Sequence, residues 1–261
     1  ELLGRKYYKK YSIYFILQKV LFVIFSIILY YLIGPEGVLI GIGLSFIPFI
    51  IQIYRSFKNT PINFQLLKTK WKFITNNFLI DLGQVFSGQI DKLLIGPLFG
   101  FSILGNYYLA IQVLNLLAII PEIVKKYTLP EDSSGINTTK IKIFTVGFSV
   151  LLALSGIFIV PEIILIFFPE YKETLELIPI ISISIIPGTI ATMYSSQFLA
   201  HEKSSHVVLT NIISALILII GIFSLGQIFG VIGLAYSFLI SSVIRALAFF
   251  ILNIIEKPNR L

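Results

Sequence analysis

The chain has 261 residues, of which 56% are hydrophobic and 13% are charged, and its mean hydropathy is +0.92. A water-soluble domain could not carry so many apolar residues without aggregating, so the composition predicts an all-α polytopic membrane protein. The chain contains no cysteine, which excludes disulfides and thiolate metal sites, and its net charge of +7 comes from basic residues between apolar segments, which does not indicate nucleic-acid binding.

Apolar segments of bilayer-spanning length follow one another along the chain. Residues 161–176 form an exception, because their apolar run is too short to cross a membrane and contains Pro161 and Pro169, which predicts an interfacial or re-entrant element. Eight transmembrane helices are predicted, at 12–33, 37–54, 73–95, 102–124, 141–160, 177–199, 206–225 and 229–252.

The basic residues predict how these spans are oriented. Most of the 20 Lys and Arg residues lie before the first span or after the second, fourth, sixth and eighth, whereas the other connections hold only Lys172. By the positive-inside rule, this predicts a multi-pass protein of the cytoplasmic membrane with both termini in the cytoplasm. Trp71 and Tyr127 lie at the predicted cytoplasmic boundary, where aromatic residues are common.

Two consecutive spans carry polar residues at helical spacing. In the third span they recur at intervals of 4, 3, 4 and 3 residues, and the fourth span repeats the same intervals. Such residues share one face of a helix, and two adjacent polar faces predict a water-filled cavity inside a membrane bundle. The first stripe comprises Asn77, Asp81, Gln84, Gly88 and Asp91, and the second comprises Tyr108, Gln112, Asn115, Ile119 and Glu122.

Three basic residues, Lys19, Lys92 and Arg245, fall within predicted spans. One interpretation is that their long side chains reach the lipid headgroups. The other is that they face the cavity as phosphate-binding cations. For Lys92, an ion pair with Asp91 or with a neighbouring helix is a third interpretation.

An internal repeat is predicted from a shift of 192 residues, which places 31–47 on 223–239 and aligns Gly34 with Gly226 and Gly41 with Gly233. The shift also superposes the first helical hairpin on the last, which indicates a parallel repeat of six spans. The predicted organisation is then 1–55 as the last two helices of an N-terminal lobe, 56–72 as a cytoplasmic linker between lobes, and 73–261 as a complete C-terminal six-helix lobe. Four further helices are expected to precede residue 1.

Several segments resemble polysaccharide and O-antigen flippases of the Wzx type, within the multidrug/oligosaccharidyl-lipid/polysaccharide exporter superfamily. Pro169 and Glu202 depart from the family pattern, since a glycine is usual at each position, and both departures concern turns. The segments that carry the resemblance are DKLLIGPLFGFSILGNYYLA (91–110), with Gly105, Tyr107 and Ala110, then FFPEYKE (167–173), FLAHEKSS (198–205) and GVIGLAYSFLIS (230–241).

The resemblance implies a twelve-helix transporter, not an enzyme, that moves a polyprenyl-linked oligosaccharide to the outer leaflet by alternating access. It implies lipid-linked oligosaccharide and membrane lipids as partners, no nucleic acid, and glycan assembly proteins as candidate partners. No cofactor is expected apart from a coupling ion, sodium or a proton. Asp81 and Glu122 are candidate sites for that ion, and Tyr107 and Tyr108 offer faces on which sugar rings could stack, while the amides of the two stripes suit sugar hydroxyls.

Other interpretations stay open at this stage. The polar residues could instead bond neighbouring helices within the bundle. A drug or cation exporter of the same superfamily is the first alternative function, and a membrane-embedded glycan-processing enzyme is a less favoured one. The two histidines, His201 and His206, share one short turn with Glu202, where a metal pair is conceivable but solvated side chains are more common.

Overall fold

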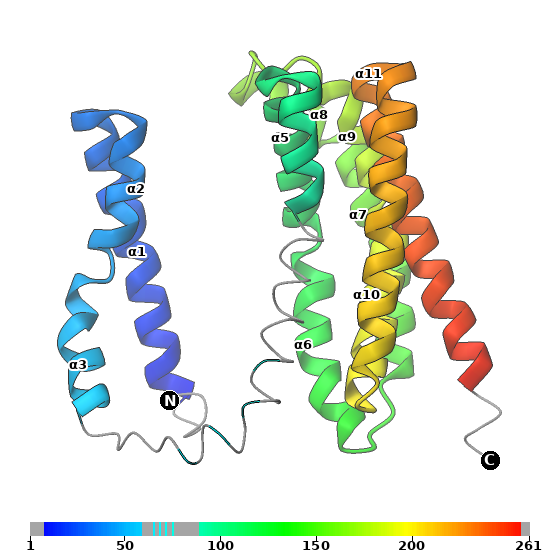
Figure 1. Cartoon of the computed structure of the whole chain (residues 1–261), viewed down its shortest axis with the longest axis horizontal. Helices are drawn as coiled ribbons and strands as arrows, with labels where there is room; N and C mark the ends of the chain where they lie inside the picture. The colour runs from blue at the N-terminus through cyan, green and yellow to red at the C-terminus, as the bar shows by residue number, and fades with distance from the viewer. Residues whose placement is uncertain are drawn as a thin grey trace. The chain divides into compact units, whose positions relative to one another are not determined.

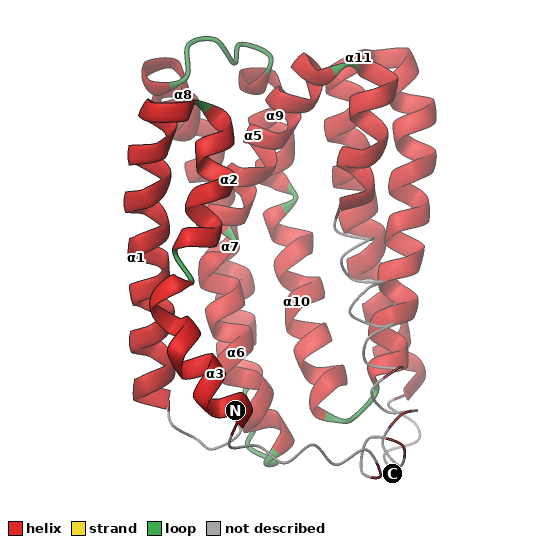
Figure 2. Ribbon diagram, turned by 60° about the vertical axis from the view of Figure 1, so that its left-hand side comes forward, coloured by secondary structure: helices red, strands yellow, loops and turns green. Residues whose placement is uncertain are grey.

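The computed structural model describes residues 8–58 and 89–256, together with four single positions, 65, 68, 71 and 75. All regular structure within these residues is helical, and they include no strand (Figure 2). The predicted all-α class is therefore confirmed. The chain divides into two compact units, residues 1–71 (unit 1) and 72–261 (unit 2), and each is described by itself (Figure 1).

Unit 1 is built on a helical hairpin. The hairpin turns at Gly34, whose φ of 85° is unfavourable for residues with a Cβ, and Pro35 then begins the second helix, where no backbone N–H is needed. Gln18 donates a hydrogen bond of 3.0 Å to Ser45 and so links the two arms. The helices are α1 (Tyr8–Ile33), α2 (Pro35–Leu44), the short 3-10 helix η1 (Ile47–Phe49) and α3 (Ile50–Lys58).

The predicted span at 37–54 is not continuous. Helix α2 ends at Leu44, and a new helix begins only after η1, which contains Pro48. Proline has no N–H to donate to the carbonyl group of Leu44, and its ring also disfavours helical geometry in the preceding residue. The expectation of one uninterrupted helix at 37–54 was therefore wrong.

Unit 2 begins, in its described part, with helical residues 89–99. Helices α5 and α6 meet at an angle of 47° and form one bent pair, and α9 and α10 form a second with an angle of 42°. The helices are α5 (Phe101–Leu117), α6 (Ile119–Ser133), α7 (Thr139–Phe158), α8 (Val160–Phe167), α9 (Thr174–Ile183), α10 (Ile185–Ala200) and α11 (Ser204–Glu256).

Both bends occur at the same short sequence, Ile-Ile-Pro, at 119–121 and 185–187. Pro121 would have to donate to the carbonyl group of Leu117, and Pro187 to that of Ile183, but proline has no N–H. Each helix is interrupted just before its Ile-Ile-Pro sequence and continues in a new direction.

Helix α11 consists of two antiparallel arms, 204–229 and 231–256, because Gly230 has a φ of 58° and reverses the chain. Figure 1 shows the first arm rising in yellow and orange and the second descending in red. Within the described residues, three helical segments are long and apolar enough to cross a membrane, and up to five if each bent pair counts as one span.

The element predicted at 161–176 is corrected by the structure. Residues 160–167 form α8, which continues α7 within one apolar segment, Thr139–Phe167, and only 168–173 form a turn. Pro161 is tolerated because it lies in the first turn of α8, where its missing N–H breaks no hydrogen bond of that helix.

The hairpin of unit 1 and the arms of α11 share their turn geometry. A Cβ on Gly37 would lie 2.2 Å from the carbonyl oxygen of Leu29, and a Cβ on Gly233 would lie 2.0 Å from that of Leu225. Relative to Gly34, Gly37 and Leu29 occupy the same positions as Gly233 and Leu225 occupy relative to Gly230. The two turns are therefore related by an offset of 196 residues. The predicted offset of 192 was therefore wrong by four residues, about one helical turn.

Small residues allow the arms of each hairpin to approach closely. A Cβ on Gly41 of α2 would lie 2.9 Å from the hydroxyl oxygen of Ser26 in α1, and a Cβ on Gly221 would lie 2.7 Å from that of Ser237. At the offset of 196, Ser237 is the counterpart of Gly41, whereas Gly221 lies one residue before the counterpart of Ser26, so each hairpin brings one glycine against one serine without an exact exchange of positions.

The core of unit 2 lies between residues 89–99, α5, α9 and both arms of α11. A second apolar cluster, around Phe198, lies between α10 and the outer ends of those arms. The fully buried large side chains of the main core are Ile95, Tyr107, Leu177, Ile178, Ile181, Ile222 and Leu234.

Candidate functional site

The first predicted stripe lies mostly outside the described residues. Asn77, Asp81 and Gln84 belong to this undescribed part, and the described helix begins at residue 89, so Asp91 is the stripe residue that the structure places.

The second stripe lies on the outer face of α5 and α6, away from the core of unit 2. Tyr108 is 45% exposed, Ile119 is 50% exposed, and the side chain of Glu122 is 49% exposed. Asn115 is exposed and Gln112 is half-buried, and the Asn115 amide donates to the Gln112 amide oxygen at 3.3 Å. The opposite face of α5 buries Asn106, Tyr107, Ala110, Ile111, Val113 and Leu114.

These two amides do not join α5 to a neighbouring helix in the described part of the chain, because they bond each other along the same helix. The described contacts therefore do not support the alternative interpretation, in which these amides only bond neighbouring helices of the bundle. Their remaining donors and acceptors form no hydrogen bond with another described residue and could bond a ligand or water.

Asp91 is only 3% exposed and bonds to other residues of the unit. Its carboxylate accepts hydrogen bonds from the Tyr107 hydroxyl at 2.8 Å, from the Lys92 backbone N–H at 2.9 Å and from the Lys92 ammonium at 3.4 Å. Asp91 is therefore buried against α5 in this structure, and its assignment to a substrate cavity stays a prediction. A carboxylate at this depth requires partners, and the neighbouring helix supplies one.

Tyr107 is completely buried. Its ring is packed within the core and is not accessible in this structure, so the prediction that it stacks on a sugar has no support here. Tyr108, the next residue, points outward, and the Lys92 ammonium lies 6.0 Å from the centre of its ring. Tyr108 and Lys92 thus form the end of the exposed stripe, where a cation lies over an aromatic face.

The other end of the stripe is charged. Glu122 forms an ion pair of 3.8 Å with Lys125 and is close enough to Arg245, on the second arm of α11, to attract it electrostatically. The Nε of Arg245 is buried and has no hydrogen-bond partner among the described residues. Arg245 and Glu122 are thus electrostatically coupled, but they do not form an ion pair in the structure.

Lys19, the third cation within a predicted span, lies in unit 1. It is exposed, and its ammonium lies 5.5 Å from the centre of the Phe15 ring. The contact joins two residues on successive turns of α1, so it fits a lysine whose stem lies along its own helix.

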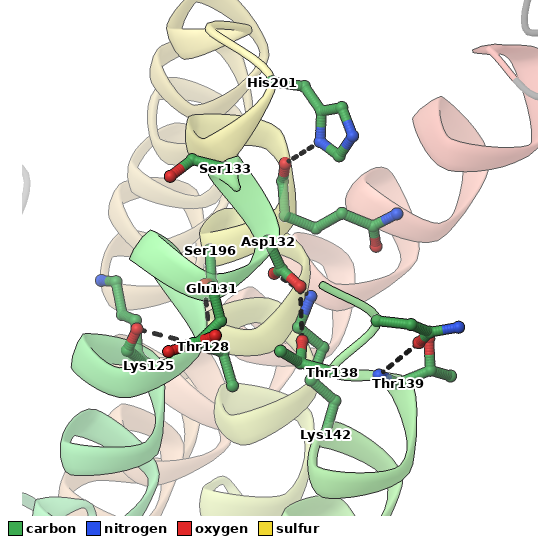
Figure 3. A network of polar contacts seen from close by, with 12 residues as sticks. Lys125, Thr128, Glu131, Asp132, Ser133, Thr138, Thr139, Lys142, Ser196 and His201 are labelled. Atoms are coloured by element: carbon green, nitrogen blue, oxygen red, sulfur yellow. Dashed lines mark hydrogen bonds and ion pairs between the residues drawn. The ribbon is translucent and has the colours of Figure 1, made fainter. Parts of the chain in front are cut away.

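A network of polar contacts joins α6, α7 and α10 at the end of unit 2 that carries most of its basic residues (Figure 3). Asp132 accepts hydrogen bonds of 2.5 Å from the Thr138 hydroxyl and from the Lys142 ammonium. The hydroxyls of Thr128 and Ser196 lie 3.0 Å apart and connect α6 with α10. The sequence analysis did not predict this network. Asp132 is an acidic residue in a connection that is otherwise rich in lysine, and this contrast could have indicated an ion pair there.

The histidines make separate contacts. His201 lies 2.8 Å from the carbonyl oxygen of Gln197 through Nδ1, whereas His206 lies 2.8 Å from Glu256 through Nε2 and stacks on Phe198. Glu256 also pairs with Lys203, and this ion pair connects the turn between α10 and α11 to the end of α11. In the ranges 8–58 and 89–256, no three His, Cys, Asp or Glu residues are grouped so as to hold a metal ion.

The exposed stripe as a whole is a polar surface on apolar helices. It offers amide donors and acceptors at its centre, an aromatic face beside a lysine at one end, and an acid paired with Lys125 at the other. Such a surface can bind a large, uncharged, hydroxyl-rich group and an adjacent anionic group.

Comparison with known families finds one match, to a family of polysaccharide biosynthesis proteins, over residues 4–137. Comparison with curated proteins and with solved structures finds no match. The matched residues make up more than half of the chain and include the exposed stripe. The chain therefore belongs to the polysaccharide biosynthesis protein family.

Proposed function

We propose that the protein moves a lipid-linked oligosaccharide from the cytoplasmic to the outer leaflet of the cytoplasmic membrane by alternating access of two lobes. The observation that carries this proposal is the exposed stripe on α5 and α6, whose amides, Gln112 and Asn115, face away from the core of their own unit. Family membership supports a transporter of polysaccharide precursors rather than an enzyme.

The physical need for such a stripe follows from the cargo. An oligosaccharide headgroup loses its hydrogen bonds to water in hydrocarbon, at a cost of several kcal/mol for each unsatisfied group. A transporter therefore has to replace those bonds along the path, whereas the lipid tail stays in the bilayer. Amide side chains are suited to this, because each can both donate to and accept from sugar hydroxyls.

The charged ends of the stripe suggest further roles. Lys92 and Arg245 would bind the phosphates that join sugar to lipid, and Tyr108 would stack on a sugar ring. Glu122, together with Asp81, is the candidate for binding a coupling ion, sodium or a proton. Glycan assembly proteins are the candidate partners.

In this proposal, unit 2 provides the C-terminal lobe and residues 1–55 provide the last two helices of an N-terminal lobe, with 56–72 as the linker between them. The turn geometry that both hairpins share supports this assignment, since it repeats at an offset of 196 residues. Both termini of the chain are placed in the cytoplasm.

The experiment uses the natural full-length gene in cells. The double variant Gln112→Leu/Asn115→Leu replaces the natural protein, and lipid-linked oligosaccharide is measured in spheroplasts with and without an impermeant glycosidase. We expect the oligosaccharide to accumulate in a form protected from the enzyme. The control is Asn211→Leu/Gln227→Leu, which removes two amides of α11 outside the stripe. Equal export by both variants would show that the stripe does not carry the cargo.

A further inference from the structure

Unit 2 contains a cavity that is separate from the exposed stripe. It has a volume of about 690 Å³ and lies between α7, α10 and the second arm of α11. None of the stripe residues lines it. Its size is in the range of cavities that bind small molecules.

One end of the cavity is polar. Thr139 and Lys142 from the start of α7, Gln197 from the end of α10 and Asn253 from the end of α11 all line it. These three helix ends lie at the basic end of the unit, where the polar network of Figure 3 is found. The side-chain amides of Gln197 and Asn253 form no hydrogen bond with another residue in the described part of the chain.

The rest of the cavity is apolar. Pro187, Ile190 and Val243 line the part farther from the polar end. Leu247 and Phe250, which also line it, are 52% and 48% exposed and lie on the outer surface of the unit. A cavity with such a rim opens at the lateral surface of the unit. Because an apolar helix in a membrane is surrounded by lipid, the cavity opens toward lipid.

We propose that this cavity binds one membrane phospholipid, with an acyl chain in the apolar part and the phosphodiester at the polar end. The two amides, the Thr139 hydroxyl and the Lys142 ammonium converge as donors where the headgroup would lie. An apolar occupant alone would leave the amides unsatisfied at the edge of the hydrocarbon, and a polar occupant alone would not fill the apolar part. An amphiphile satisfies both.

The charge at the polar end selects among amphiphiles. Lys142 is the cation that lines the cavity, and its ammonium is already paired with Asp132; the two side chains are 14% and 8% exposed. An ammonium has three N–H donors, so a further oxygen can be bound, but no positive charge remains to balance a diphosphate. A single phosphodiester carries one negative charge and a lipid-linked diphosphate carries two, so the phosphodiester is bound beside this neutral ion pair at a smaller electrostatic cost, and the site is distinct from that of the proposed cargo.

The test uses the full-length protein in dodecyl maltoside micelles that contain a trace of phosphatidylglycerol with a diazirine in one acyl chain, because the phospholipid of a vesicle would itself compete for the site. After irradiation, labelled peptides are identified by mass spectrometry. We expect labelling concentrated in peptides that contain 187–197 and 243–253. Added phosphatidylglycerol should lower this labelling saturably, whereas diacylglycerol, which has no phosphate, should not.

Two variants examine the two ends of the cavity. Val243→Trp fills the apolar part, and its control is Ile240→Trp on the same arm, because Ile240 is equally exposed but does not line the cavity. Gln197→Leu/Asn253→Leu removes the amides, and each lost hydrogen bond should weaken competition by phosphatidylglycerol about fivefold. Ile240→Trp should keep the natural pattern.

Three results would overturn the proposal. Labelling that is spread evenly over the lipid-facing helices and unchanged in Val243→Trp would show that no lipid occupies the cavity. Equal competition by diacylglycerol would show that the polar end does not recognise phosphate. Stronger competition by a polyprenyl diphosphate than by phosphatidylglycerol would assign the cavity to the cargo. None of these results depends on transport, so the proposed function can fail or hold independently.

Discussion

The hydroxyl group of Tyr107 donates a hydrogen bond of 2.8 Å to Oδ2 of Asp91, and both residues are buried. The bond joins α5 to the helix before it and places a neutral donor against a carboxylate within the core of unit 2. Since a buried carboxylate needs every donor it has, this contact holds the two helices together at the point where the chain turns at Gly100.

Tyr107→Phe should therefore destabilise the protein by about 1–3 kcal/mol, because it removes a donor from a buried carboxylate without changing the shape of the ring. Thermal unfolding of the full-length protein in detergent measures the effect. Tyr108→Phe is the matched control, since its ring is exposed, and it should leave the midpoint unchanged. Equal midpoints for both variants would contradict the role given to the bond.

The attraction between Glu122 and Arg245 can be measured by a double-mutant cycle. Glu122→Gln and Arg245→Met should each lower stability, and the double variant should lower it by less than the sum, with a coupling of about 0.5–3 kcal/mol. Lys125 competes for Glu122, so the same cycle with Lys125→Met should give a smaller coupling, because that pair is more exposed. A strictly additive Glu122–Arg245 cycle would place the two groups out of contact.

The ion pair of Asp132 and Lys142 is well shielded from water, and breaking it should be costly. Lys142→Met leaves the Asp132 carboxylate without its cation, and we expect a loss of about 3 kcal/mol. Lys125→Met, which breaks a half-exposed pair, should cost about 1 kcal/mol or less. Adding Asp132→Leu to Lys142→Met should restore part of the lost stability, because the unpaired carboxylate is then removed. If the loss came only from a packing defect at Lys142, the second substitution would not restore it.

Close contact at the two hairpin turns predicts equivalent behaviour of Gly37 and Gly233. An alanine at either position would press its Cβ against a backbone carbonyl, and we expect a loss of about 1–3 kcal/mol in each case. Gly43→Ala and Gly188→Ala are the controls, since nothing lies within 4 Å of the added carbon. If only one of the two hairpins is sensitive, their turns are not equivalent.

The orientation of the bundle can be checked across a single span. The chain contains no cysteine, so Ser134→Cys and Glu170→Cys each introduce one thiol, at opposite ends of the segment Thr139–Phe167. In intact cells, an impermeant thiol reagent should label the cysteine at 170 and not the one at 134, whereas both should react after lysis. Labelling in the opposite sense would reverse the predicted topology.

Much of the helical architecture could be predicted from the apolar segments, since α1 contains the predicted 12–33 and α7 with α8 contains the predicted 141–160. The direction of the two bends could not be predicted from the sequence, although both bends coincide with Ile-Ile-Pro. A proline removes a hydrogen bond, but the direction in which the helix then bends depends on the packing of both halves against their neighbours.

The site shows the same division. Helical period placed Gln112 and Asn115 on one face of α5, and in the structure their amides bond each other there, with Asn115 exposed and Gln112 half-buried. The same period assigned Asp91 to a polar face, yet the residue is buried, because period gives a direction around one helix and not what lies in that direction. Its partner, Tyr107, is close in space but lies on the next helix. The offset of the repeat failed for a related reason, since identities among many Ile and Gly residues are too weak to fix it within one turn.

The reversal at Gly230 has a consequence for how the chain enters the membrane during synthesis. No Lys, Arg, Asp or Glu occurs between Val207 and Ile244, so most of the first arm, the turn and the part of the second arm before Arg245 carry no formal charge. Since Gly230 joins the arms without a loop, they leave the insertion machinery as one apolar hairpin rather than as two spans separated by a hydrated segment. Arg245 and Glu256 follow only after the turn has crossed, and both lie in the arm that returns toward the side from which the hairpin entered.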